Sequence, residues 1–280
     1  MRILITGANG YIGSRLVEMC LDKGFDIIAV DISNDYIDSR ATYINFDIFS
    51  DSNLFETNDL LSVDILIHLA WRNGFVHNDL SHIQDLPKHI TFLKQSIEKG
   101  IKYISVMGSM HEVGYYEGAI NENTPCNPMS LYGISKNALR QVMQLLANEY
   151  NFNLHWLRAY YIMGNDLRSN SIFGKIVRKS LEGATEFSMN SGKNKYDFIL
   201  LEQLCEQIIA SSVQKEINGV INVCSGRPVS LGEQVEKFIQ DNNINMNLNY
   251  GVFPDRPYDS PCVYGDTKKI KKIMLNRLNR

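Results

Sequence analysis

Short apolar runs recur from residue 2 to about residue 158 and alternate with longer amphipathic segments. The runs lie at 3–5, 27–30, 65–69, 103–107 and 154–157. They predict buried strands, and the segments between them predict helices. This alternation is typical of a parallel sheet that helices cover on both faces. Because right-handed crossovers return every strand to the same end of the sheet, residues that follow the strands should meet at one edge, where ligands bind.

The pattern loosens beyond about residue 165. Helices are predicted at roughly 171–182, 200–213 and 231–241, separated by short strands and glycine turns. We therefore predict an α/β fold with a Rossmann-type doubly wound parallel sheet in residues 1–165, the part that would hold the cofactor. Residues 166–280 are expected to form mainly a smaller C-terminal substrate-binding cap, with some segments that return to the sheet.

Composition narrows the classes of function. The chain has 280 residues, of which 44% are apolar, and this suffices for one large α/β domain. A formal charge of -3 without a long basic block predicts no nucleic-acid partner. Five widely spaced cysteines predict free thiols and no metal site. The chain shows neither a signal-peptide pattern nor an apolar run of about 18 residues, so we expect a cytoplasmic protein without a membrane partner.

The first strand runs directly into a glycine turn and an amphipathic helix, in the sequence RILITGANGYIGSRLVEMCL. In this context Gly7 permits a tight turn, Gly10 lets backbone N–H groups approach a pyrophosphate, and Gly13 allows the helix to pack closely on the strand. The order of strand, turn and helix predicts a dinucleotide site.

An acidic residue follows the second strand and bears on the choice of cofactor. Asp31 can accept hydrogen bonds from the hydroxyls of an adenosine ribose, and its charge would repel the extra phosphate of NADP. NAD(H) is therefore favoured, while the nearby Arg40 leaves NADP(H) open. Asp47, after the third strand, is a candidate for the adenine amino group or a turn-forming residue.

Tyr132 and Lys136 lie four residues apart on a strongly helical segment, so both project from one face. A lysine ammonium and an oxidised nicotinamide would stabilise the phenolate form of the tyrosine. Ser109 follows the strand at 103–107 and should reach the same edge of the sheet. Its hydroxyl can hydrogen-bond the substrate oxygen to which Tyr132 transfers a proton. Ser109, Tyr132 and Lys136 are thus the predicted catalytic residues.

Taken together, these residues resemble the extended short-chain dehydrogenases, the family of nucleotide-sugar epimerases, dehydratases and reductases. The resemblance covers nearly the whole chain and rests on these segments in order: TGANGYIG at 6–13, Asp31, Asp47, IHLAW at 67–71, GSMHEVG at 108–114, YGISK at 132–136, LRAYYIMG at 157–164, YDFI at 196–199, NVCSG at 222–226 and RPYD at 256–259. It implies a Rossmann domain, the catalytic set above, a nucleotide-diphosphate sugar as substrate and, by analogy, a homodimer.

The predicted cofactor site contains the glycine turn, the ends of three strands and the catalytic helix. Its members are Gly7, Asn9, Gly10, Tyr11, Ile12, Gly13, Asp31, Asp47, Ile48, Leu69, Ala70, Trp71, Tyr132 and Lys136. Trp71 has a second interpretation as a core aromatic. The predicted substrate contacts are Arg72, Ser109, Met110, His111, Tyr161 and Arg256.

The segment after Ser109 separates the reactions of the family. The resemblance implies an Asp-Glu pair there in sugar 4,6-dehydratases, whereas this chain has Met110 and His111. Methionine cannot exchange protons, so dehydration is disfavoured, although His111 or Glu112 keeps it open. We therefore predict an NAD(P)-dependent enzyme of activated deoxysugar biosynthesis, which reduces the C4 ketone of a nucleotide 4-keto-6-deoxyhexose. An NAD-dependent 4-epimerase is the alternative, and a 4,6-dehydratase or a non-catalytic dinucleotide-binding regulator is less favoured.

Two positions depart from the pattern of the family. Tyr161 stands where relatives usually have an asparagine near the substrate phosphates, and Asp85 lies in a region where they show other residues. Arg256 is our candidate for the sugar diphosphate, because a guanidinium fork matches two phosphate oxygens. Tyr196 and Asp197 are expected to be structural.

Overall fold

The computed structural model describes residues 1–57, 60, 62–164, 167–255 and 259–278. Its main element is the predicted parallel sheet, with strand order β11-β7-β5-β4-β1-β2-β3. The strands are β1 (Arg2–Thr6), β2 (Asp26–Asp31), β3 (Thr42–Asn45), β4 (Ile65–His68), β5 (Tyr103–Ser109), β7 (Asn153–Ala159) and β11 (Gly219–Val223). The chain builds outward from β1 in one direction and then crosses to β4 in the other. The switch point between β1 and β4 is where doubly wound folds bind ligands.

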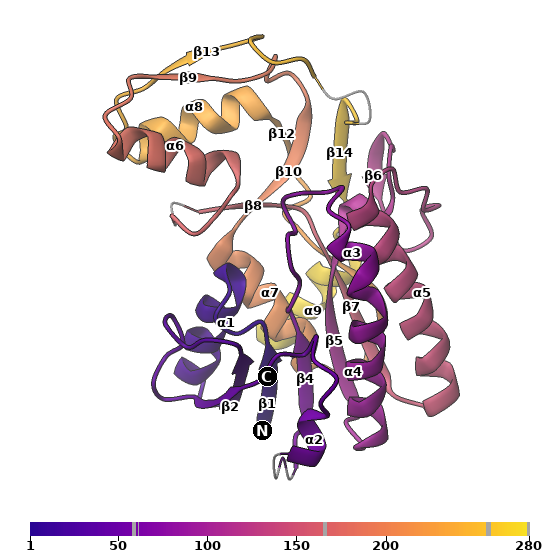
Figure 1. Ribbon diagram of the computed structural model, residues 1–280. Helices are drawn as coiled ribbons and strands as arrows, with labels where there is room; N and C mark the ends of the chain where they lie inside the picture. Colours follow the sequence, from indigo (N-terminus) through magenta and orange to yellow (C-terminus); the bar gives the residue numbers. More distant parts are fainter. Residues whose placement is uncertain (58–59, 61, 165–166, 256–258, 279–280) are drawn as a thin grey trace.

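Helices cover both faces of this sheet, as Figure 1 shows. One face carries α1 (Tyr11–Asp22), α7 (Leu201–Val213) and α9 (Lys268–Leu278), and the other carries α2 (Leu54–Thr57), α3 (Ser81–Gln84), α4 (Leu86–Glu98) and α5 (Leu131–Tyr150). Alternate residues of β1 supply the two cores: Ile3 and Ile5 face α1 and α7, whereas Leu4 packs with residues of α4 and α5. The apolar strands are therefore buried on both sides.

A smaller unit lies beyond the carboxyl ends of the large sheet (Figure 1). Its sheet has the order β12-β10-β14-β6, and β8 pairs with β10. The elements of this cap are β6 (Gly118–Ile120), β8 (Tyr161–Met163), α6 (Ile172–Leu181), β9 (Glu186–Ser188), β10 (Lys195–Leu200), β12 (Pro228–Ser230), α8 (Leu231–Asp241), β13 (Asn247–Asn249) and β14 (Cys262–Gly265), with the short 3-10 helix η1 (Met110–Glu112) below them. The chain passes between the units several times, because β6 and β8 join the cap whereas α7, β11 and α9 join the large sheet.

The buried carboxylate of Asp197, on β10, connects the two units. Its oxygens accept hydrogen bonds from the backbone N–H groups of Ser225 (2.8 Å), Gly226 (2.8 Å) and Gly265 (3.0 Å), and from the Ser225 hydroxyl (2.6 Å). Ser225 and Gly226 follow β11 of the large sheet, and Gly265 ends β14 of the cap. Asp197 is thus structural, as the sequence predicts.

Asp197→Ala should lower the free energy of unfolding by about 3 kcal/mol, because it leaves several buried donors without an acceptor. Urea unfolding followed by circular dichroism measures this loss. The control Asp241→Ala removes a carboxylate whose ion pair with Lys237 is exposed (2.9 Å), and it should cost no more than about 0.5 kcal/mol. Equal losses in the two variants would contradict the role given to Asp197.

Candidate functional site

The three predicted catalytic residues come together at the carboxyl edge of the large sheet. Ser109 is the last residue of β5, and Tyr132 and Lys136 lie in the first two turns of α5. The side chains of Ser109 and Tyr132 are hydrogen-bonded. The Lys136 amine donates to the Met107 carbonyl of β5 at 2.7 Å, and it lies 5.9 Å from the centre of the Tyr132 ring.

Local sequence sets this geometry at the start of α5. The hydroxyl of Ser130 caps the helix by accepting from the Gly133 N–H at 3.1 Å. A Cβ atom at Gly133 would collide with the carbonyl oxygen of His111, so only glycine lets α5 pack this closely on η1. The same close approach brings Tyr132 to Ser109.

Burial is the largest influence on the pKa values of Tyr132 and Lys136. It raises the pKa of Tyr132 to about 12; the hydrogen bond from Ser109 lowers this pKa and the charge of Glu112 raises it further. Burial also lowers the pKa of Lys136 to about 7, against the upward effect of Glu112. We expected Lys136 to lower the pKa of Tyr132. In the protein alone, burial instead raises this pKa and keeps Tyr132 protonated.

A buried carboxylate, Glu112, holds Ser109 in place. One oxygen of Glu112 accepts from the Ser109 backbone N–H (2.7 Å) and from the indole N–H of Trp156 (2.8 Å). The other lies 3.2 Å from Arg140 Nε and 3.3 Å from an outer nitrogen of Arg158. These contacts occupy both oxygens, which argues against the acid-base role that the sequence left open for Glu112. The capping-box pattern of a serine followed three residues later by a glutamate was the available signal.

The glycine turn has the shape that a dinucleotide requires. Gly7 has a φ of +70°, and a Cβ atom there would lie 2.6 Å from the backbone nitrogen of Ala70. A Cβ atom at Gly13 would collide with the Gly7 carbonyl. Gly10 caps α1 without any side chain, so no capping side chain covers the start of the helix, the end at which backbone N–H groups favour an anion. These residues fit the pyrophosphate of a dinucleotide.

The polar residues around the predicted adenosine end are engaged with the protein. Asp31 accepts from the backbone N–H groups of Asn9 (2.9 Å) and Ile32 (2.8 Å). The Asn9 side chain donates to Ser33 (2.6 Å) and accepts from the Tyr36 N–H (2.7 Å), so Asn9 shapes the loop after β2. This role in the loop is one that the sequence did not indicate.

Two charged residues near this end also have partners. Arg40 forms ion pairs with Asp38 (2.6 Å) and Asp22 (2.9 Å), which removes the main argument for binding NADP. Asp47 accepts from the Phe49 N–H at 2.9 Å, the turn contact that the sequence left as one interpretation.

The remaining predicted cofactor residues line the sheet edge or the core. Ile48 is buried among the residues of the α4 face, and Leu69 packs against the α1 face. Trp71 lies beside Tyr132 and Lys136, with the Lys136 amine 3.6 Å from its ring centre. Arg72, a predicted substrate contact, instead forms a bidentate ion pair with Asp85 at 2.9 Å.

A small hollow of about 30 Å³ lies beside Tyr132. Its lining combines predicted substrate residues with others: His77, Met110, His111, Gly114, Met129, Ser130, Tyr161, Tyr196, Asp259, Ser260 and Val263. The His77 ring stacks on Tyr132, with ring centres 5.4 Å apart, and the His111 ring lies 6.1 Å from it. The sequence did not indicate this contact between His77 and Tyr132. Arg256 lies outside the described residues.

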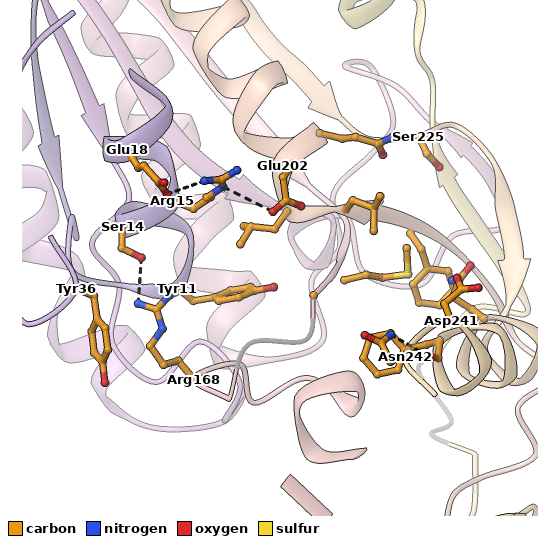
Figure 2. Close-up of a pocket in the computed structure, with 18 of the residues that line it drawn as sticks. Tyr11, Ser14, Arg15, Glu18, Tyr36, Arg168, Glu202, Ser225, Asp241 and Asn242 are labelled. Atoms are coloured by element: carbon orange, nitrogen blue, oxygen red, sulfur yellow. Dashed lines mark hydrogen bonds and ion pairs between the residues drawn. The ribbon is translucent and has the colours of Figure 1, made fainter. Parts of the chain in front are cut away.

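A second, wider cleft of about 1340 Å³ separates α1 from the cap (Figure 2). Arg168, which follows β8, spans it by donating to the Ser14 hydroxyl at 3.0 Å and lying over the Tyr36 ring at 4.3 Å. Arg15 pairs with Glu18 across the same surface. Ser109, Tyr132 and Lys136 do not line this cleft.

The described residues contain no group of three or more histidine, cysteine, aspartate or glutamate side chains that could hold a metal ion. None of the described helices has the length and apolar character needed to cross a membrane.

Comparisons with known proteins point to one family. A family model described as "NAD dependent epimerase/dehydratase family" matches residues 3–224. The chain is 45% identical over 270 residues to a dTDP-6-deoxy-L-talose 4-dehydrogenase (NAD(+)) of Aggregatibacter actinomycetemcomitans, an alignment that spans 95% of this chain and 99% of that relative. A dTDP-4-dehydro-6-deoxyglucose reductase of Escherichia coli is 24% identical over 84% of this chain and 79% of its own length.

A solved structure shares the fold. The UDP-glucose 4-epimerase of Thermotoga maritima, determined with UDP-glucose, matches with a TM-score of 0.84 at 20% identity, covering 97% of this chain and 92% of that chain. The predicted fold class is therefore confirmed.

Glu112→Gln should lower the free energy of unfolding by about 3 kcal/mol, because two guanidinium groups lose their buried counter-charge. It should also reduce turnover, because the glutamine NH2 group would face the two guanidinium groups and the resulting repulsion would disturb the segment that holds Ser109. Urea unfolding and an activity assay on the folded variant measure the two effects. The matched change Glu122→Gln alters an exposed ion pair with Lys269 (3.3 Å) and should leave both quantities nearly unchanged. A stable, fully active Glu112→Gln enzyme would refute this assignment.

Proposed function

This chain belongs to the NAD dependent epimerase/dehydratase family, and we propose that it interconverts a C4 ketone and a C4 hydroxyl on a dTDP-activated 6-deoxyhexose with NAD(H). The observation that carries the proposal is the 45% identity, over nearly the whole length of both chains, to a dTDP-6-deoxy-L-talose 4-dehydrogenase (NAD(+)). The arrangement of Ser109, Tyr132 and Lys136 supplies the chemistry that such a reaction needs.

Each catalytic residue has a separate task during ketone reduction. When bound, NADH supplies the hydride for C4. Tyr132 donates its phenolic proton to the C4 oxygen, and the Ser109 hydroxyl donates a hydrogen bond that stabilises the charge developing there. Lys136 holds the hydroxyls of the nicotinamide ribose and stabilises the phenolate that Tyr132 leaves behind. The hydrogen bond between Ser109 and Tyr132 supports this division, because both hydroxyls then face one substrate oxygen.

Neither Met110 nor Glu112 supplies a proton donor or acceptor for dehydration. Met110 is buried among apolar residues and carries no exchangeable proton. Both oxygens of Glu112 are taken by structural partners. A redox reaction at C4 therefore fits the site better than elimination across C5 and C6.

Incubation with dTDP-4-keto-6-deoxyhexoses and NADH should consume one NADH for each sugar reduced, as followed by the absorbance of NADH and by chromatography of the sugar nucleotides. A 4-epimerase would instead form product without net NADH loss, because it recovers the hydride. Product without NADH consumption, or no product with any 4-keto-6-deoxyhexose, would overturn the proposal.

Tyr132→Phe serves as the matched variant in this assay. It should lower kcat by about a hundredfold or more while NADH affinity changes little, because only the proton donor is removed. Tyr150→Phe, on the exposed end of the same helix, should retain full activity.

Cofactor preference gives a separate prediction. Asp31→Asn keeps one acceptor oxygen but loses the charge, so preference for NADH over NADPH should fall about tenfold or more in kcat/KM. Arg40→Ala should leave the preference unchanged, because two carboxylates already neutralise that guanidinium. If Arg40→Ala abolished NADPH use, the residue that reads the ribose would have to be reassigned.

A further inference from the structure

Lys136 is a buried amine with few partners. Its nitrogen donates to the Met107 carbonyl at 2.7 Å and lies 3.6 Å from the centre of the Trp71 ring. Glu112 exerts its charge from a distance, but its oxygens are paired with Arg140 and Arg158. The local stabilisation of a charged Lys136 therefore comes from a carbonyl and an aromatic face.

The Trp71 indole is fixed by a buried histidine. Its N–H lies 3.0 Å from His82 Nδ1, and His82 Nε2 lies 3.0 Å from the Val76 carbonyl. Because an indole nitrogen only donates, His82 Nδ1 must accept, and Nε2 must carry the proton that it donates to Val76. His82 is thereby held as one neutral tautomer, only 2% exposed.

A second imidazole stacks on the same indole. The rings of His89 and Trp71 lie 4.3 Å apart at an angle of 15°, and His89 is in turn within 2.9 Å of His68. These contacts restrict both the plane and the in-plane rotation of Trp71. An indole restrained in this way offers a fixed face for a cation.

We propose that Trp71, oriented by His82, is a positioning residue that holds the Lys136 ammonium on its indole face. The proposal rests on the function proposed above, in which Lys136 binds the cofactor ribose and stabilises the tyrosinate. A cation in contact with an indole away from water is stabilised more strongly than an exposed one. Trp71 thus offsets part of the cost of burying the lysine charge.

Several titratable groups surround this contact. Tyr132 faces Lys136 from α5, Glu112 from η1, His68 from the end of β4 and His89 from α4. Burial, and then Lys136, lowers the pKa of His68 to about 3, and burial lowers the pKa of His89 well below its usual value. Both histidines are therefore neutral where Lys136 titrates, near pH 7.

The test is a direct titration of Lys136 in the full-length protein. Lysine labelled with carbon-13 at Cε is observed by NMR as pH is varied, and Lys136→Met identifies the signal. Trp71→Leu should lower the pKa of Lys136 by about one unit, because the charged form loses its aromatic face. His82→Leu should lower it by a smaller amount, since the indole then loses its orientation. Ile83→Ala, an exposed neighbour on α3, should leave it unchanged.

Kinetics give a second arm. The alkaline limb of ketone reduction should move to lower pH in Trp71→Leu and His82→Leu, and Trp71→Phe, which keeps an aromatic face, should restore most of it. An unchanged Lys136 pKa in both leucine variants would overturn the proposal. If Trp71→Leu does not fold, His82→Leu alone decides by the same criterion. The NMR titration needs no turnover, so failure of the proposed function would appear only in the kinetic arm.

Discussion

The arrangement of Ser109, Tyr132 and Lys136 depends on the buried carboxylate of Glu112. Its contacts join three elements: the end of β5 through Ser109, β7 through Trp156 and Arg158, and α5 through Arg140. A buried charge is tolerated only when it is paired and hydrogen-bonded, and Glu112 meets both conditions. Since α5 also carries Tyr132 and Lys136, this one group fixes the strand that supplies the serine relative to the helix that supplies the acid and the amine.

Two glycines make this network sterically attainable. A Cβ atom at Gly108 would collide with the indole nitrogen of Trp156, the donor to Glu112, and one at Gly133 would collide with the His111 carbonyl. Neither glycine has a positive φ, so both are required by close approach and not by backbone conformation. Gly108 and Gly133 are therefore packing requirements, as is Gly13 at the glycine turn, whereas Gly7 is required both by close approach and by its positive φ.

The sequence predicted what depends on local order and on strand position. The apolar runs located the strands, and the position of Ser109 after a strand predicted that it lies near Tyr132 and Lys136. The sequence did not predict which polar side chains already have partners within the protein. Arg72 pairs with Asp85, and Arg40 with Asp38 and Asp22, because the tertiary fold brings those carboxylates within reach. Residue type shows what a side chain can bind, whereas only the fold shows what it already binds.

The electrostatics of the site distinguish the two directions of the proposed reaction. Ketone reduction needs a neutral tyrosine that donates a proton, and burial of Tyr132 provides this by raising its pKa to about 12. Oxidation of the C4 hydroxyl needs a proton acceptor at the same position, which burial opposes. Positive charge from Lys136 reduces this obstacle, yet burial lowers the pKa of Lys136 to about 7. Every contact that keeps Lys136 charged therefore assists the oxidative direction most. The Met107 carbonyl belongs to the backbone, so the Trp71 ring is the close contact of the Lys136 amine that a change of side chain can alter.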